Sequence, residues 1–430
     1  MPGSRLHICL FEDQFSRNFF PLTCFRPVYD LRCGILTLRE KILHHLSASS
    51  ISLYVRQYLA SVLKEENPAA EINQISSDRR SPAGKVCLLI NGRCIMNRKL
   101  AGVLRKATSD VLFTTGGDII AVRLSGDNLA RSRTRLYGDS VDLSELEGLP
   151  KVEVEANLVR YPWDLVYANE SELINDFLLL TRNRRGILKA GKIHKSAALI
   201  GRKNVHVGRQ SIVGAGVVLD AEAGPIYIGQ NVRIFPNAAI EGPCFIGDGS
   251  SIKIGASIYG NTTIGPVCKV GGEVEHSIFH SHANKQHHGF LGHSYLSQWV
   301  NLGAGTTTSN LKNTYGSVKV HIDGRLVDSE KMFVGLTAGD HAKTGINATL
   351  DTGTVIGPSS NIYGSAIPSK FVPSFSWGEA EHLMTYQVEK ALSVAIKVMR
   401  RRNIEASRAY QELFRHVFSI TQHERVNFST

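Results

Sequence analysis

The sequence lacks long apolar runs and paired cysteines. Nowhere in its 430 residues do about 18 consecutive apolar residues occur, as a membrane-spanning helix would need. A short apolar run at residues 8–11 ends at Glu12, so it cannot be the core of a secretory signal. The seven cysteines form no Cys-x-x-Cys pair, so neither a disulfide framework nor a thiolate zinc site is predicted. We therefore expect a cytoplasmic protein with no membrane partner.

Long blocks of Lys and Arg, of the kind that bind nucleic acid, are also missing. The formal net charge is +11, yet basic residues cluster only briefly, at residues 182–185 and 400–402. This distribution favours anionic metabolites such as nucleotides, sugar phosphates and coenzyme A over nucleic acid. A merely basic surface explains the charge equally well.

A six-residue repeat dominates the second half of the chain. This period fits neither a helix nor an amphipathic strand, but it describes short strands joined by tight turns. Three such strands make one triangular coil with the aliphatic side chains stacked inside it. The repeat predicts a left-handed parallel β-helix over residues 198–368. Its clearest aliphatic positions are Ile228, Ile234, Ile240, Ile246, Ile252, Ile258, Ile264 and Val270.

The chain divides into three predicted parts. Residues 1–185 alternate strand-like runs with helical stretches, which predicts an α/β, Rossmann-like domain. Residues 186–372 form the β-helix, whose register breaks at 271–299 and 312–331, where loops are expected to leave the coil. Residues 373–430 form a C-terminal segment with a helix predicted over 377–416.

Five motifs carry a resemblance to a known family. They lie at residues 21–27, 34–41, 163–165, 288–292 and 371–378. With them the chain resembles the bifunctional N-acetylglucosamine-1-phosphate uridyltransferases/glucosamine-1-phosphate acetyltransferases. It is closer still to a divergent branch of sugar nucleotidyltransferases that carry a C-terminal β-helix. The resemblance implies a transferase of sugar-nucleotide biosynthesis, making compounds such as UDP-N-acetylglucosamine, and a homotrimer with active sites between adjacent β-helices.

The resemblance also implies an acyl transfer site in the β-helix. In the family, a Lys and a His precede Tyr-Leu-Gly and then Asn-x-Gly-Ala-Gly-Thr, and residues 285–292 and 301–306 correspond to these motifs. A neutral imidazole would take the proton of the sugar amine as the amine attacks the thioester of acetyl-CoA. Either His287 or His288 fills this role, and the choice stays open.

Six further residues carry binding roles by the same resemblance. Lys285 and Lys253 would contact the sugar phosphate, and Asn301 would position the sugar. Phe290 stands where the family has a tyrosine. Ala304 and Asn310 would line the path of coenzyme A. Each also has an ordinary structural interpretation, as a solvated lysine or a corner residue.

The histidines of this region support a rival interpretation. Two His-x4-His spacings, from His282 to His287 and from His288 to His293, could present imidazoles to zinc, as in γ-class carbonic anhydrases. Zinc would require three converging nitrogen atoms.

The first domain departs from the nucleotidyltransferase pattern. A Gly-rich loop is replaced by residues 12–17, the family lysine is Val28, and the family aspartate that holds Mg²⁺ is Arg93. Either Arg17 and Arg26 contact the phosphates of a nucleoside triphosphate, with Mg²⁺ on another carboxylate, or the domain no longer transfers nucleotides. A third alternative is a non-catalytic regulator that binds sugar nucleotide. The candidate carboxylates are Glu12, Asp13 and Asp118.

Overall fold

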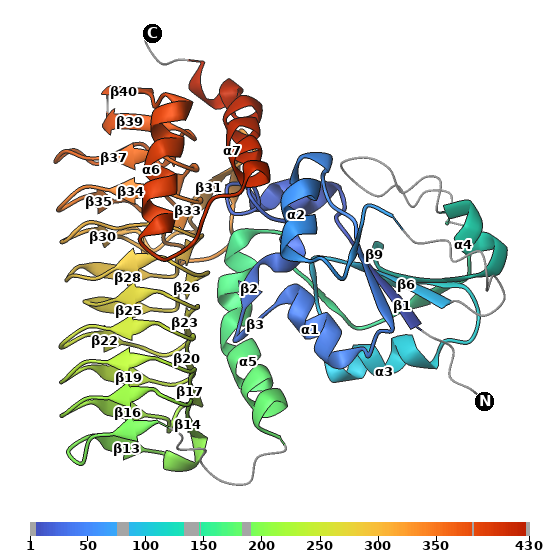
Figure 1. Cartoon of the computed structure of the whole chain (residues 1–430), viewed down its shortest axis with the longest axis horizontal. Helices are drawn as coiled ribbons and strands as arrows, with labels where there is room; N and C mark the ends of the chain where they lie inside the picture. Colours follow the sequence, from blue (N-terminus) through green and yellow to red (C-terminus); the bar gives the residue numbers. More distant parts are fainter. Residues whose placement is uncertain are drawn as a thin grey trace.

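The computed structural model describes residues 6–74, 86–132, 146, 148–182, 191–380 and 382–426. An α/β domain and a long coil of short strands lie side by side, and two C-terminal helices pack where they meet (Figure 1). The predicted boundary between residues 185 and 186 lies outside the described residues. No helix within them is long and apolar enough to cross a membrane.

The α/β domain is built on a seven-stranded sheet. Its strands are β1 (Leu6–Phe11), β4 (Ser50–Leu53), β5 (Glu71–Ile72), β6 (Val86–Asn91), β8 (Val111–Thr115), β9 (Asp118–Ser125) and β10 (Lys151–Glu153). The order is β10-β8-β9-β6-β1-β4-β5, with β1 parallel to β4 and β6 and with β9 antiparallel to both of its neighbours. Its helices are α1 (Leu38–His45), α2 (Ala60–Glu66), α3 (Arg98–Lys106), α4 (Gly126–Ser132) and α5 (Pro162–Thr181). This arrangement confirms the predicted Rossmann-like class.

The strands of the coil form three faces, in which paired strands are parallel except for β40 at the end of the second face. The first face, which contacts α5, contains β14 (Val205–Val207), β17 (Ile226–Ile228), β20 (Cys244–Ile246), β23 (Thr262–Ile264), β26 (Ile278–Phe279), β29 (Tyr295–Leu296), β33 (Thr337–Ala338), β36 (Val355–Ile356) and β38 (Phe371–Val372). The second contains β12 (Lys192–Ile193), β15 (Ile212–Val213), β18 (Arg233–Ile234), β21 (Ser251–Ile252), β24 (Lys269–Val270), β27 (Asn284–Lys285), β34 (Lys343–Thr344), β37 (Asn361–Ile362), β39 (Ser376–Glu379) and β40 (His382–Thr385). The third contains β13 (Ala198–Ile200), β16 (Val218–Asp220), β19 (Ala239–Glu241), β22 (Ser257–Ile258), β25 (Glu273–Glu275), β28 (Phe290–Gly292), β30 (Thr307–Thr308) and β35 (Thr349–Leu350).

The interior of the coil follows the predicted register. Ile228 pairs with Ile246 and Ile246 with Ile264, and all three side chains are fully buried. These stacked aliphatic side chains supply the hydrophobic stabilisation of the coil. The arrangement is that of the predicted left-handed β-helix.

The first predicted interruption is wrong, and the second is a true insertion. Across residues 271–299 the coil continues, because β24 pairs with β27, β25 with β28 and β26 with β29. Only the corners are shorter there, which breaks the six-residue spacing without breaking the ladder. Residues 312–331 do leave the coil and form the hairpin of β31 (Lys319–Ile322) and β32 (Arg325–Asp328).

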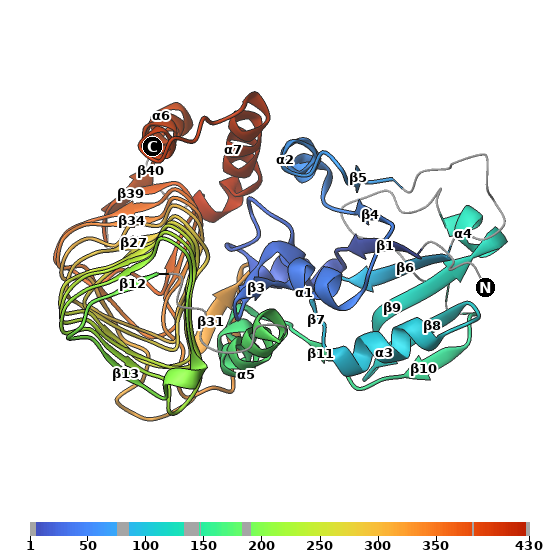
Figure 2. The same cartoon turned by 60° about the horizontal axis from the view of Figure 1, so that its bottom comes forward.

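The C-terminal segment differs from the single helix predicted over 377–416. β39 and β40 form a hairpin at the end of the second face, and two helices follow, α6 (Val388–Arg400) and α7 (Arg408–Ile420). The helices separate near Asn403, which has a left-handed backbone (φ 58°). α6 lies along the second face of the coil (Figure 2), and α7 reaches the α/β domain, where Phe414 contacts Phe25.

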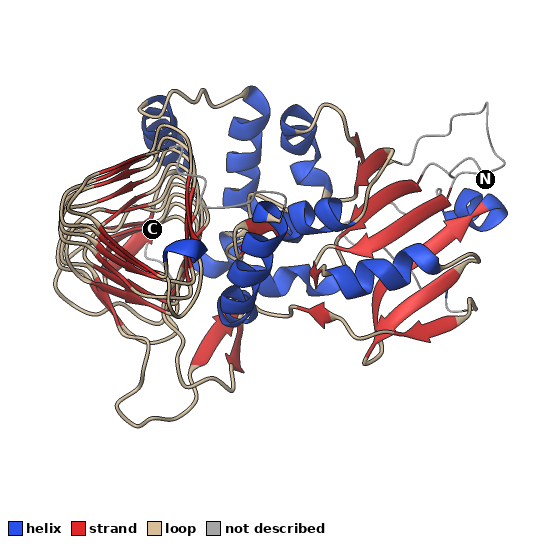
Figure 3. Cartoon of the chain, turned by 90° about the horizontal axis from the view of Figure 1, so that it is seen from below, coloured by secondary structure: helices blue, strands red, loops and turns tan. Residues whose placement is uncertain are grey.

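The α/β domain lies against the coil (Figure 3), and buried polar side chains join it to the first face of the coil. The guanidinium of Arg26 forms a bidentate ion pair with the carboxylate of Asp340. The hydroxyl of Tyr295 accepts from the amide of Arg32 at 2.8 Å and donates to its carbonyl at 3.0 Å. Both ends of each contact are buried, so the two parts pack as one unit.

Candidate active site

The histidines of residues 276–293 lie at three corners of the coil, where one face ends and the next begins. His282 lies between the first and second faces, which we call the first–second corner. His287 and His288 lie between the second and third faces, at the second–third corner, and His276 and His293 lie between the third and first faces, at the third–first corner. His276, His282 and His293 have φ values of 43°, 55° and 47°. Such left-handed positions are needed at tight corners and tolerate His better than most residues. Neither His-x4-His pair converges, so the predicted zinc site is not formed by these histidines.

A different trio comes close at the third–first corner. Glu275, His276 and His293 each place one ligand atom within 4.8 Å of the others. The two imidazoles stack with ring centroids 4.6 Å apart and planes 5° apart, and each contacts a side-chain amide, of Asn261 and Asn310 respectively. Because the two rings are parallel, the lone pairs of their nitrogen atoms do not converge on one point, as a metal ion would require. The arrangement therefore fits a hydrogen-bonded stack better than a metal centre.

The two candidate bases lie together and exposed. His287 and His288 follow β27, and neither imidazole makes a hydrogen bond within the described part of the chain. The carbonyl of His288 accepts from the amide of Gly305 at 3.1 Å, so this turn stacks directly on the one containing Ala304. The second–third corner thus joins both histidines to the Gly-Ala-Gly segment, as the resemblance implied.

Lys285 points into the coil instead of outward. It pairs in register with Val270 and is 1% exposed. Its Nζ donates to the carbonyls of Gly271, His287 and Gly289. Burial lowers the pKa of this lysine to about 8. The side chain holds the turn that carries the two histidines and does not reach a surface where a sugar phosphate could bind.

Asn301 and Lys253 lie on the second face, near this corner. Asn301 bridges Asn284 and Lys343 in the ladder and lines a cavity of about 290 Å³. Lys253 is half-buried over the ring of Phe235. Asn301 and Lys253, both predicted to bind the sugar phosphate, therefore lie on one surface, next to the turn that carries His287 and His288.

Phe290 and Asn310 lie further around the coil. Phe290 belongs to the third face. Asn310 lies at the third–first corner, where its amide donates to Glu275 at 2.9 Å. One chain therefore does not bring Asn310 together with His287 and His288.

In the α/β domain, every candidate metal carboxylate is paired with an arginine. Glu12 is bound by Arg56, with Nε to Oε2 at 3.0 Å and both side chains buried. Asp118 is bound by Arg160 at 2.6 Å. These carboxylates are already neutralised by side chains of the same chain.

Arg93, at the position of the family's metal aspartate, fills the same region. Its side chain is fully buried and its Nη2 lies 2.5 Å from Oδ2 of Asp13. Its Nη1 donates to the carbonyl of Val159, and Phe15 lies against the guanidinium. A cation thus occupies the place where a cation-binding carboxylate was expected, so these residues do not fit Mg²⁺.

The two arginines predicted to contact phosphate are separated. Arg17 is exposed on the short helical turn Gln14–Phe19 and makes no ion pair within the described residues. Arg26 is buried at the domain interface, where Asp340 binds its guanidinium. Only Arg17 is free to meet a ligand. Nothing in the spacing of the sequence distinguished it from Arg26.

The first domain is of a known class. Residues 8–185 match the family model described as sugar nucleotidyl transferase, which confirms the resemblance for this part of the chain.

Curated relatives extend the comparison. The chain is 32% identical over 120 residues to a bifunctional sugar-1-phosphate nucleotidylyltransferase/acetyltransferase of Sulfurisphaera tokodaii, covering 28% of this chain and 26% of the relative. It is 31% identical over 182 residues to the bifunctional protein GlmU of Synechococcus elongatus, covering 37% and 36%. With GlmU of Ruthia magnifica it shares 27% over 251 residues, covering 56% and 50%. The matches thus span about a quarter to a half of these relatives.

Among solved structures, a UDP-N-acetylglucosamine acyltransferase of Francisella novicida aligns with a TM-score of 0.29 and 17% identity. The alignment covers 56% of this chain and 77% of that one.

Proposed function

We propose that this chain transfers the acetyl group of acetyl-CoA to the amino group of a sugar phosphate at the second–third corner of its β-helix. One observation carries the proposal: two exposed imidazoles, with no hydrogen-bond partner among the described residues, lie on the turn that stacks against the Gly-Ala-Gly segment. The adjoining second face presents Asn301 and Lys253 to an anionic sugar. The relative of Sulfurisphaera tokodaii, whose name includes acetyltransferase, supports the same chemistry.

The reaction needs one base. The free amine of the sugar attacks the carbonyl carbon of the thioester while His287 or His288 accepts the amine proton. The C–S bond then breaks, and the thiolate of coenzyme A leaves and takes up a proton. Exposure of both imidazoles allows the acquired proton to pass to water.

The proposed assembly is a homotrimer. His287 and Asn310 lie at different corners of one coil, so a neighbouring β-helix is required to bring both to one acetyl-CoA molecule. In this proposal the α/β domain binds a sugar nucleotide or sugar phosphate without Mg²⁺-dependent nucleotidyl transfer, because Arg56, Arg93 and Arg160 occupy its candidate carboxylates.

The test is an acetyl transfer assay. Wild-type protein should release the thiol of coenzyme A when given acetyl-CoA and glucosamine 1-phosphate. His287→Ala/His288→Ala should lower kcat by about 10²–10⁴-fold, whereas His194→Ala, an exposed histidine of the first coil, should leave it unchanged. Equal turnover in the double variant would eliminate the proposed base.

A second assay examines the α/β domain. With UTP or dTTP, sugar 1-phosphate and Mg²⁺, no pyrophosphate should be released. Magnesium-dependent pyrophosphate release would show that the arginine pairs open and that the domain is a working nucleotidyltransferase.

A further inference from the structure

A row of polar side chains runs along the second face towards its end. In register, Asn284 pairs with Asn301, Asn301 with Lys343, Lys343 with Asn361 and Asn361 with Trp377. Residues paired in a parallel ladder point the same way, and each step is about 4.8 Å. The row is therefore about 19 Å long. Both of its ends open into cavities beside α6.

The first cavity, of about 290 Å³, is cationic. Four of its side chains are basic, and it contains no carboxylate. Lys269 and Lys343 come from the second face, whereas Arg401 and Arg402 follow α6. Arg402 is anchored over the face by a 2.9 Å hydrogen bond from its Nη2 to the side chain of Asn284. The two residues that follow α6 thus supply half of the positive charge of this cavity.

Within the described residues, no carboxylate forms an ion pair with these four cations. Burial, together with repulsion from Arg402 and Lys253, lowers the pKa of Lys269. Burial lowers the pKa of Lys343 to about 8. Placing like charges together costs free energy that an anionic ligand would recover.

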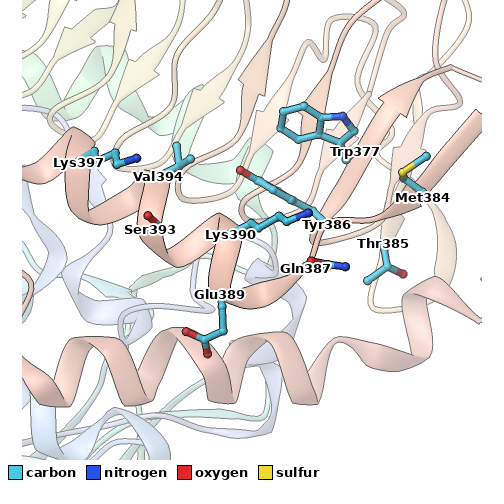
Figure 4. A pocket seen from close by; sticks show the side chains of 10 residues that line it. All are labelled: Trp377, Met384, Thr385, Tyr386, Gln387, Glu389, Lys390, Ser393, Val394 and Lys397. Carbon is cyan, nitrogen blue, oxygen red and sulfur yellow. The ribbon is translucent and has the colours of Figure 1, made fainter.

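The second cavity, of about 720 Å³, lies between α6 and the hairpin of β39 and β40 (Figure 4). Lys397 lines it, and the next residue, Val398, lines the first cavity. Trp377 and Tyr386 form an aromatic wall, with ring centroids 4.7 Å apart. The carboxylate of Glu389, also in this cavity, is bound by Arg415 of α7. The second cavity therefore offers an aromatic surface beside Lys390 and Lys397, which form no ion pair in the part of the chain that the structure describes.

We propose that this groove between α6 and the second face binds the nucleoside diphosphate portion of a ligand. Its phosphates would meet Lys269, Lys343 and Arg402, and its base would stack on Trp377. The row from Lys343 to Trp377 is two ladder steps, or about 10 Å. Coenzyme A and UDP-sugars both contain this group. The first cavity also contains Asn301, which the proposed function assigns to the sugar, so the inference rests on the proposed function for this shared cavity and for which of the two is the natural ligand.

Binding can be measured by calorimetry on the full chain, with inorganic pyrophosphate, coenzyme A and UDP as separate probes. Arg402→Gln and Lys269→Gln should each weaken all three about ten- to a hundred-fold, as expected for lost charged hydrogen bonds. The matched control is Arg400→Gln, because Arg400 is two residues away and pairs with Glu405. It should change affinity less than two-fold.

Trp377→Leu tests the aromatic end of the groove by itself. It should weaken the binding of coenzyme A or UDP but not the binding of pyrophosphate. Tighter binding of coenzyme A than UDP assigns the groove to the acetyl donor, and the reverse assigns it to a sugar nucleotide. Absence of binding by every probe at low salt overturns the inference, as does an equal loss in Arg400→Gln and Arg402→Gln. His287→Ala/His288→Ala should keep full affinity, so a failure of acyl transfer is distinguishable from a failure of this site.

Discussion

The buried ion pair between Arg26 and Asp340 gives a sharp test of how the two domains are joined. Asp340→Ala removes a carboxylate that is 1% exposed and leaves the guanidinium of Arg26 buried without its counter-charge. It also removes the acceptor of Ser297, whose hydroxyl lies 2.8 Å away. Breaking such a buried pair costs about 3–5 kcal/mol. The midpoint of urea unfolding should therefore fall by about 1–2 M.

Two controls complete this experiment. Asp351→Ala removes a half-exposed carboxylate that pairs with Lys370, and it should cost less than about 1 kcal/mol. Arg26→Met/Asp340→Leu replaces both charges with apolar groups and should recover most of the loss, because no buried charge is left unpaired. If Asp340→Ala unfolds at the same urea concentration as Asp351→Ala, the domain interface described above is not formed.

Three further outcomes follow from the corners of the coil. Burial and the neighbouring His276 lower the pKa of His293 to about 3. The unfolded chain therefore binds an extra proton between about pH 6.5 and 3, and in this range the free energy of unfolding falls by about 1.4 kcal/mol for each unit by which the pH is lowered. In urea titrations from pH 7 to 4.5, His293→Asn should therefore lose less stability on acidification than the wild-type protein. Val267 is β-branched at φ 60°, so Val267→Asn should raise the free energy of unfolding by about 1 kcal/mol, and a loss would contradict the strain argument. Lys285→Met should lower the free energy of unfolding by about 1–3 kcal/mol, because carbonyls at the turn of His287 and His288 lose their donor. Unchanged stability would mean that this lysine faces solvent.

The β-helix was predictable because its signal is local and repeated. An inward aliphatic side chain is required once in each strand, so Ile228, Ile246 and Ile264 appear at fixed spacing and stack as expected. The turn of the β-helix that leads to Lys285 keeps the same ladder, but its shorter corners remove the six-residue spacing from the sequence. A rule based on spacing fails there although the hydrogen bonding continues.

The candidate site was predictable only in part. The motif brought His287, His288 and Ala304 to one corner, which adjacent turns fix through backbone hydrogen bonds. It did not show that Lys285 fills an interior position, because an inward lysine and an outward one share the same sequence pattern. Nor did it show the cations that follow α6, which are far from the motif in sequence.

By itself, the sequence determined the two architectures, the family of the first domain and the turn that carries the paired histidines. These depend on short-range patterns: alternation, a six-residue period and contiguous motifs. The tertiary structure alone decided which charges are free and which are used. Arg26, Arg56 and Arg93 pair with carboxylates of distant segments, whereas Arg402 lies with Lys269 and Lys343 in a cavity that no carboxylate of the described residues lines. Pairing depends on three-dimensional distance and burial, which no linear spacing encodes.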